Sequence, residues 1–136
     1  MEYSIGEAAQ KAGISASTLR YYEKEGLLPS IKRNKNGIRS FTDEDLQSLR
    51  IIECLKATEM PIKDIRKFID LCADGDNSLQ ERYELFLDRK AAVQKQIAEL
   101  QEVAKVIDFK CWYYQTAIEA GTEKIHAGKS KISSIV

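Results

Sequence analysis

The chain has 136 residues, of which 43% are hydrophobic and 31% charged, and its 21 basic side chains balance 21 acidic ones. This length has room for one compact domain and an appendage, and the balanced charge by itself suggests no class of partner. Residues 1–3 lead directly into a predicted helix without the apolar segment of a signal peptide, and no run approaches the ~18 apolar residues of a membrane span. The three cysteines are far apart and indicate no disulfide framework, so we expect a cytoplasmic protein without a membrane partner.

Charge is concentrated in residues 15–42. This segment contains six basic residues and only two acidic ones, Glu23 and Glu25, which gives it a local charge of +4. The basic residues are Arg20, Lys24, Lys32, Arg33, Lys35 and Arg39. A local excess of this kind indicates a polyanionic partner, although a solvated basic loop has the same composition.

Two short helices separated by a glycine turn are predicted near the N-terminus. Ser4 and Glu7 have the spacing of a capping box, and the helix that they begin ends at Gly13. Ser15 can cap a second helix over residues 16–24. Two such helices joined by a tight turn are typical of a helix-turn-helix.

A β-hairpin and two further helices are predicted next. Asn36-Gly37 lies between two short segments, residues 29–33 and 38–41, and predicts a hairpin because both turn residues tolerate a positive φ. Such a ribbon beside a helix-turn-helix is called a wing. Thr42 can cap a third helix, and Pro61 is expected at the first position of a fourth.

From Leu79 the apolar residues recur every 3.5 positions, and only Lys90 interrupts the stripe. Its members are Leu79, Tyr83, Phe86, Val93, Ile97, Leu100, Ala104, Ile107, Cys111, Tyr114 and Ile118. We expect this stripe to form a coiled coil with a second copy, because a lone helix would leave it in water; the alternative is that it folds back on the third and fourth helices.

The predicted fold is therefore mainly α: a winged helix-turn-helix domain with accessory helices over residues 1–77, followed by a long coiled-coil dimerisation helix over residues 78–120. Residues 121–136 are expected to be a flexible tail in which His126 is solvated.

The second helix and the wing closely resemble the MerR family of bacterial transcriptional regulators. Residues 18–23 read Thr-Leu-Arg-Tyr-Tyr-Glu and are followed by Gly26-Leu27-Leu28, which is the hallmark of that family. The wing, residues 31–41, is similar to the family's wing, with Ile38 in place of the usual Tyr and with Arg39 retained. The resemblance extends over about residues 3–118.

This resemblance implies a homodimer, formed through an antiparallel coiled coil, that binds a pseudo-palindromic promoter operator in double-stranded DNA. The dimer would bend and untwist an overlong spacer so that RNA polymerase can engage both promoter elements. Of two adjacent tyrosines on a helix, one packs inside while the other can present its hydroxyl to a phosphate. The expected DNA contacts, foremost Arg20 and Tyr22, are Ser17, Thr18, Arg20, Tyr21, Tyr22, Lys32, Arg33, Lys35 and Arg39.

No metal or cofactor is expected, because no cysteine follows Cys111 and the single histidine is His126. Cys54 resembles in its position the cysteine of short family members that respond to aldehydes and thiol-reactive stress. A nearby cation such as Arg50 or Lys56 would favour the reactive thiolate. Alternatively, Cys54 is a small buried hydrophobe, and Cys72 and Cys111 are expected to be structural.

Catalysis is not expected, since the sequence shows no catalytic constellation and no glycine-rich phosphate loop. Two other functions remain open: a repressor without chemical sensing, and a coiled-coil adaptor whose basic domain binds a protein. DNA binding differs from protein binding in its steep dependence on salt.

Overall fold

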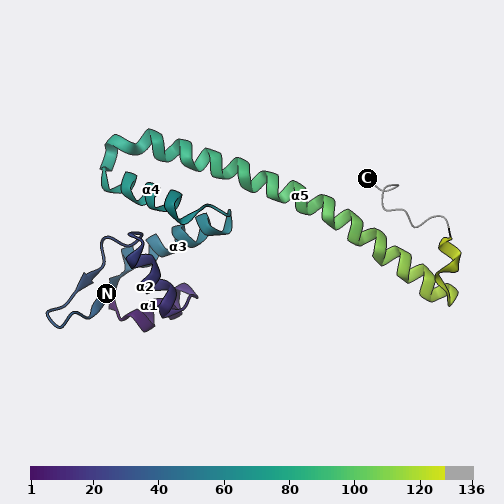
Figure 1. The fold of residues 1–136 in the computed structure, drawn as a ribbon, viewed down its shortest axis with the longest axis horizontal. Coiled ribbons are helices and arrows are strands. Elements are labelled where there is room, and N and C mark those ends of the chain that lie inside the picture. Colours follow the sequence, from purple (N-terminus) through teal and green to yellow (C-terminus); the bar gives the residue numbers. More distant parts are fainter. Residues whose placement is uncertain (128–136) are drawn as a thin grey trace. The chain divides into compact units, whose positions relative to one another are not determined.

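The computed structural model describes residues 1–127 of the chain. The chain divides into two compact units, Met1–Arg89 and Lys90–Val136. The elements follow in the order β1 (Glu2–Tyr3), α1 (Ile5–Ala12), α2 (Ala16–Lys24), β2 (Lys32–Arg33), β3 (Arg39–Thr42), α3 (Asp43–Ala57), α4 (Ile62–Ala73), the 3₁₀-helix η1 (Gly75–Ser78), α5 (Leu79–Ala120) and the 3₁₀-helix η2 (Glu123–His126) (Figure 1). The predicted mainly helical fold, with a wing and a long C-terminal helix, is confirmed.

The helix-turn-helix forms where local capping predicts it. The backbone N–H of Glu7 donates to Ser4 Oγ at 3.1 Å, and the Ser4 N–H donates to Glu7 Oε1 at 2.9 Å, so both groups of the capping box are satisfied. Ser15 Oγ accepts from the N–H of Thr18 at 3.0 Å and begins α2. Between the helices Gly13 has φ 71°, a left-handed conformation that a side chain would strain.

A small antiparallel sheet joins the N-terminus to the wing, with the strand order β1-β3-β2. Strand β1 was not predicted: instead of leading directly into α1, Glu2 pairs with Thr42 and Tyr3 with Phe41. Two residues are too few to show an alternating pattern, so only the neighbouring strand reveals this one.

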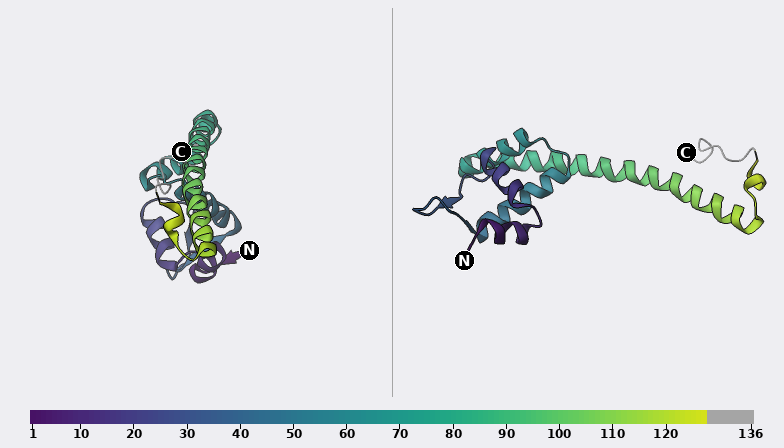
Figure 2. Two further views of the ribbon diagram at one scale, coloured as in Figure 1. Left: turned by 90° about the vertical axis from the view of Figure 1, so that its right-hand side faces the viewer. Right: turned by 60° about the horizontal axis from the view of Figure 1, so that its bottom comes forward.

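The predicted hairpin is confirmed, but its turn is longer than the predicted Asn-Gly turn. Gly37 alone takes a positive φ, 77°, and Asn36 does not. The side chain of Asn34 organises the loop instead, since its Oδ1 accepts the N–H groups of Asn36 at 2.9 Å and Ile38 at 3.0 Å. The hairpin extends away from the helices of its unit (Figure 2).

The core of the first unit is built from the inner faces of α1 to α4. Its buried members are Ala8, Ala9, Leu19, Tyr22, Leu27, Leu28, Phe41, Leu49, Ile52, Leu55, Met60, Ile65 and Phe68. Asp45, only 2% exposed, joins this core to the base of the wing. Its carboxylate accepts from the Ser30 hydroxyl at 2.6 Å, before β2, and from the N–H of Thr42, the last residue of β3, at 2.8 Å. Both ends of the wing are thereby held at the start of α3.

The start of α4 corrects one detail of the sequence-based prediction. Pro61 is the N-cap of α4 and not its first helical residue. Ser78 does not cap α5 with its oxygen: the hydroxyl donates to backbone carbonyls of Leu71 and Gly75, and it accepts from Arg82 Nε at 3.0 Å.

The first turns of α5 belong to the first unit and fold back on its other helices. Leu85 packs against the core, and the Phe86 ring contacts Phe68 edge-on with centroids 5.3 Å apart. The sequence left open whether the apolar stripe pairs with a second copy or folds back on the third and fourth helices. For this short part of α5, the stripe folds back.

Further along, α5 keeps its apolar stripe exposed: Ile97 is 51% exposed, Leu100 67%, Ile107 57% and Ile118 79%. At 1.5 Å per residue the 42-residue helix is about 63 Å long. Within residues 1–127 none of the helices combines the length and the apolar character needed to cross a bilayer.

In the second unit, α5 is followed by the 3₁₀ turn η2 at Glu123–His126, where a flexible tail was predicted. His126 is only 4% exposed and not solvated, which corrects the prediction for that residue. Its Nε2 lies 2.6 Å from Thr116 Oγ1 and 3.0 Å from the carbonyl oxygen of Tyr113, and its ring stacks on Tyr113 with centroids 4.3 Å apart. The remaining part of the predicted tail, residues 128–136, lies outside the described residues.

Candidate nucleic-acid interface

Helix α2 has one buried face and one exposed polar face. Leu19 and Tyr22 point into the core, with 1% and 0% of their surface exposed. Ser17, Arg20 and Tyr21 lie on the exposed face, where Tyr21 is 47% exposed. A polar, basic face at the start of the second helix of a helix-turn-helix is the one that enters the major groove in proteins of this class.

Thr18 is half-buried at the first turn of α2. Its Oγ1 lies 2.8 Å from Ser15 Oγ, so the two hydroxyls form a hydrogen bond between cap and helix. A DNA contact through Thr18 would therefore use its second hydrogen-bonding position.

Tyr22 is where the structure departs most from the predicted contacts. The sequence predicts it among the foremost DNA contacts, but the residue is buried, and its hydroxyl donates to Glu53 Oε1 at 2.5 Å and accepts from Lys56 Nζ at 2.7 Å. Burial and the adjacent carboxylate raise the pKa of Tyr22 far above its ordinary value, so the phenol stays a neutral donor. Of the two tyrosines, Tyr21 is the one available to a phosphate.

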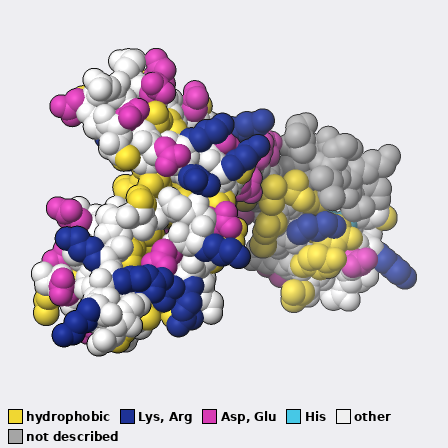
Figure 3. All heavy atoms as spheres, turned by 60° about the vertical axis from the view of Figure 1, so that its left-hand side comes forward, with side chains coloured by type: hydrophobic (Ala, Val, Ile, Leu, Met, Phe, Trp, Pro, Cys, Tyr) yellow, Lys and Arg dark blue, Asp and Glu magenta, His cyan; other side chains and the backbone are white. Residues whose placement is uncertain are grey.

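The wing carries four cations in two different environments. Lys32 and Lys35 are exposed. Arg33 and Arg39 both pair with Glu23 of α2, at 2.7 Å and 3.1 Å. Lys and Arg side chains are prominent on the surface of this unit (Figure 3). Glu23, which the sequence shows only as a negative charge, is thus the link between α2 and the wing.

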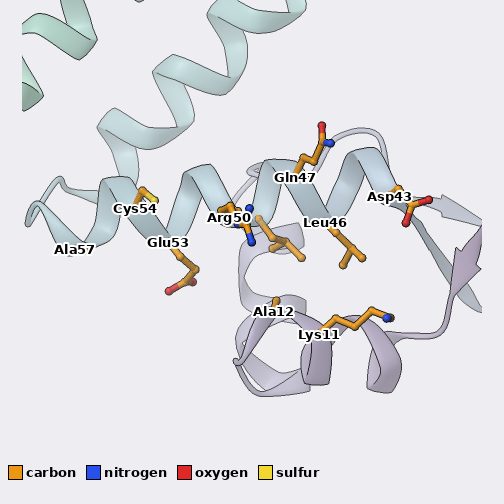
Figure 4. A pocket seen from close by; sticks show the side chains of 10 residues that line it. Lys11, Ala12, Asp43, Leu46, Gln47, Arg50, Glu53, Cys54 and Ala57 are labelled. Carbon is orange, nitrogen blue, oxygen red and sulfur yellow. The ribbon is translucent and has the colours of Figure 1, made fainter.

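A groove of about 780 Å³ lies between α1 and α3, and Cys54 is one of its lining residues (Figure 4). The other lining residues are Lys11, Ala12, Asp43, Leu46, Gln47, Leu49, Arg50, Glu53 and Ala57. Cys54 is exposed in the single chain, which does not fit the alternative of a small buried hydrophobe in the core of its unit. Arg50, one turn earlier, shares the groove with it, whereas Lys56 is bound to Tyr22.

The other two cysteines, Cys72 and Cys111, are also exposed in the single chain, which does not fit a role in the core of either unit. Among residues 1–127 no cluster of three or more His, Cys, Asp and Glu side chains is arranged to hold a metal ion.

The geometry is that of a winged helix-turn-helix protein that presents a polar helix face beside a basic hairpin. Comparison with known proteins agrees: residues 3–72 match the MerR HTH family regulatory proteins, and residues 46–108 match the MerR DNA-binding family. An uncharacterized helix-turn-helix transcriptional regulator of Haemophilus influenzae is 45% identical over 124 residues, which cover 91% of this chain and 92% of that protein. The Bacillus subtilis regulator YyaN, also uncharacterized, is 35% identical over 89% of this chain and 96% of its own length.

Among solved structures, the chain is similar to HiNmlR, a MerR family regulator lacking the sensor domain, bound to promoter DNA. The TM-score is 0.85 at 45% identity, and the match covers 92% of this chain and 99% of HiNmlR. The chain therefore belongs to the MerR family. It is a DNA-binding transcriptional regulator of the MerR type and not an enzyme.

Proposed function

We propose that the chain binds a pseudo-palindromic promoter operator as a homodimer and remodels the spacer to control transcription by RNA polymerase. The observation that carries this proposal is the exposed face of α2, with Arg20 and Tyr21, beside the exposed wing lysines Lys32 and Lys35. Base edges are read by a helix in the groove, while cations at its flanks bind phosphates and fix the register.

Arg20→Ala should weaken binding to an operator duplex by about tenfold or more, because a base or phosphate contact of an arginine is worth about 1–3 kcal/mol. The side chain is exposed and makes none of the ion pairs formed among residues 1–127, so the variant should fold normally. Lys63→Ala, on the exposed surface of α4, is the control for loss of one positive charge. Unchanged operator binding by Arg20→Ala would contradict the interface.

Dimerisation is proposed through α5, over the predicted segment 78–120. The support is the exposed stripe, which includes Ile97, Leu100, Ile107 and Ile118 and which no other segment among residues 1–127 covers. Such a continuous apolar surface is typical of a protein interface. Phe86 and its neighbour Leu85 would contribute less, because they already pack within the first unit.

A response to aldehydes or other electrophiles through Cys54 is the finer part of the proposal. Cys54 is exposed and lines the groove together with Arg50, and a thiolate is the reactive form of cysteine. The Cys54 thiolate would add to the carbonyl carbon of an aldehyde, and the carbonyl oxygen would take a proton from water to give a hemithioacetal. This step needs no oxidant.

The path from Cys54 to the DNA passes through its neighbour on α3. Glu53 holds the hydroxyl of Tyr22, which lies on the recognition helix α2. An adduct at the exposed Cys54 would take up space in the groove that Glu53 also lines, and would displace the Glu53 side chain. A shift of Glu53 would then move the Tyr22 hydroxyl that it binds, and with it helix α2.

Cys54→Ser should keep DNA binding but lose the transcriptional response to an aldehyde such as formaldehyde in a promoter-reporter assay. Cys72→Ser and Cys111→Ser are the controls: the Cys72 thiol is exposed but lies outside the groove, and Cys111 belongs to the proposed dimer stripe of α5. If Cys54→Ser responds as wild type does, the chain is a regulator without sensing at this thiol. The adaptor alternative predicts instead that binding to duplex DNA shows no steep salt dependence.

A further inference from the structure

The wing has a second attachment besides its base. Glu23, near the end of α2, receives Arg33 Nη2 at 2.7 Å, and Arg39 Nε lies 3.1 Å from each of its carboxylate oxygens. Arg33 and Arg39 face each other across the hairpin in register. One carboxylate therefore connects the recognition helix to both strands of the wing.

Little else holds the shaft of the hairpin at a defined angle. Asp45 fixes the base through Ser30 and Thr42, but residues 32–38 are all exposed, and the apolar Ile38 is 59% exposed. Arg33 also donates through Nη1 to the carbonyl of Gly37 at 2.8 Å, which locks the guanidinium to the tip of its own hairpin. Beyond the base, which the β1–β3 pairing and the packing of Ile31 and Phe41 also hold, the Glu23 carboxylate is the contact that joins the hairpin to α2.

We propose that Glu23 is a positioning residue for operator recognition: it holds the wing arginines against α2 and sets the spacing between the phosphates reached by the wing and the bases reached by the helix. The inference rests on the proposed DNA interface. Its physical reason is preorganisation, since long side chains and a mobile hairpin would otherwise have to be ordered when DNA binds. Glu23 is 23% exposed, so solvent screens these pairs only in part.

The sign of the effect separates positioning from simple electrostatics. Glu23 is acidic, so its removal makes the interface more positive and should strengthen binding to any DNA if charge alone matters. Positioning predicts the opposite for a specific site, because operator binding needs the helix and the wing engaged together. Non-specific binding tolerates many wing angles and should not weaken.

The test compares Glu23→Gln with Glu25→Gln in the full chain. Both remove one negative charge, but Glu25 makes none of the ion pairs found in the described part of the chain. Two probes are used: a duplex selected by the wild-type protein from a random-sequence library, and a scrambled duplex of equal length. Thermal melting of both variants establishes that they are folded.

Glu23→Gln should bind the selected duplex about tenfold more weakly than Glu25→Gln, with equal or tighter binding to the scrambled duplex. Its log-log salt slope on the selected duplex should fall by about 0.9 for each phosphate that the wing no longer reaches. The positioning role is overturned if Glu23→Gln binds the selected duplex as tightly as Glu25→Gln does. Arg39→Ala tells failure of the positioning role from failure of the proposed DNA interface. If both Glu23→Gln and Arg39→Ala bind the selected duplex as wild type does, the wing is not part of the DNA interface. If Arg39→Ala loses affinity and Glu23→Gln does not, the wing interface stands and only the positioning role of Glu23 fails.

Discussion

Exchanging the two tyrosines of α2 for phenylalanine, one at a time, separates a core role from a DNA-binding role. Tyr22→Phe removes the hydroxyl that donates to Glu53 and accepts from Lys56 at 2.7 Å, while the ring remains in the core. A hydrogen bond to a charged group contributes about 1.5–3 kcal/mol. Glu53 lines an open groove and regains water, which reduces the expected loss to about 1–2 kcal/mol.

That loss corresponds to a decrease of about 3–10 °C in Tm for a domain of this size. Tyr21→Phe removes an exposed hydroxyl and should change stability by less than about 0.5 kcal/mol. Operator affinity should show the reverse order, because a hydrogen bond to a phosphate is worth about 1.5–3 kcal/mol, or about tenfold or more.

Thermal melting and titration of an operator duplex measure both quantities on the same two variants. We expect Tyr22→Phe to be destabilised with wild-type affinity, and Tyr21→Phe to be stable with weakened affinity. The opposite result, a stable Tyr22→Phe that binds DNA poorly, would refute the core placement and restore Tyr22 as a DNA contact.

Three further outcomes are expected. Folding raises the pKa of Tyr22, so the stability that the neutral Tyr22 phenol contributes is complete below the ordinary tyrosine pKa of about 10 and is lost as the pH rises above that value. Wild type should therefore lose more stability than Tyr22→Phe between about pH 9 and 11, as measured by unfolding at each pH. Leu100→Asp should split the dimer in sedimentation, since it places a charge in the proposed seam, whereas Gln101→Asp should leave it intact; a dimeric Leu100→Asp would argue against the α5 interface. Asp45→Ala should cost about 1–3 kcal/mol in urea unfolding, because it leaves the Ser30 hydroxyl and the Thr42 N–H without the acceptor that joins them; an unchanged midpoint would contradict that anchor.

Local chemistry determines much of this protein from the sequence alone. Ser4, Ser15 and Thr42 begin helices because each hydroxyl satisfies a backbone N–H three residues later, and no distant contact is needed for that. Gly13 ends α1 for an equally local reason, its positive φ. The period of the apolar residues likewise predicts the long helix α5 and the face that it exposes.

Tertiary structure decided which side chains are buried and which charged side chains pair with each other. Helix periodicity places Tyr21 and Tyr22 about 100° apart around α2. The way in which α2 packs against α3 decides that Tyr22 is the buried one, and it brings the Tyr22 hydroxyl to Glu53, 31 residues away in the chain. His126 is buried for the same reason, because the turn after α5 returns its ring to Tyr113. Glu23 has two positive partners 10 and 16 residues away. Such pairs depend on the path of the chain between them, which the identities of the residues do not specify on their own.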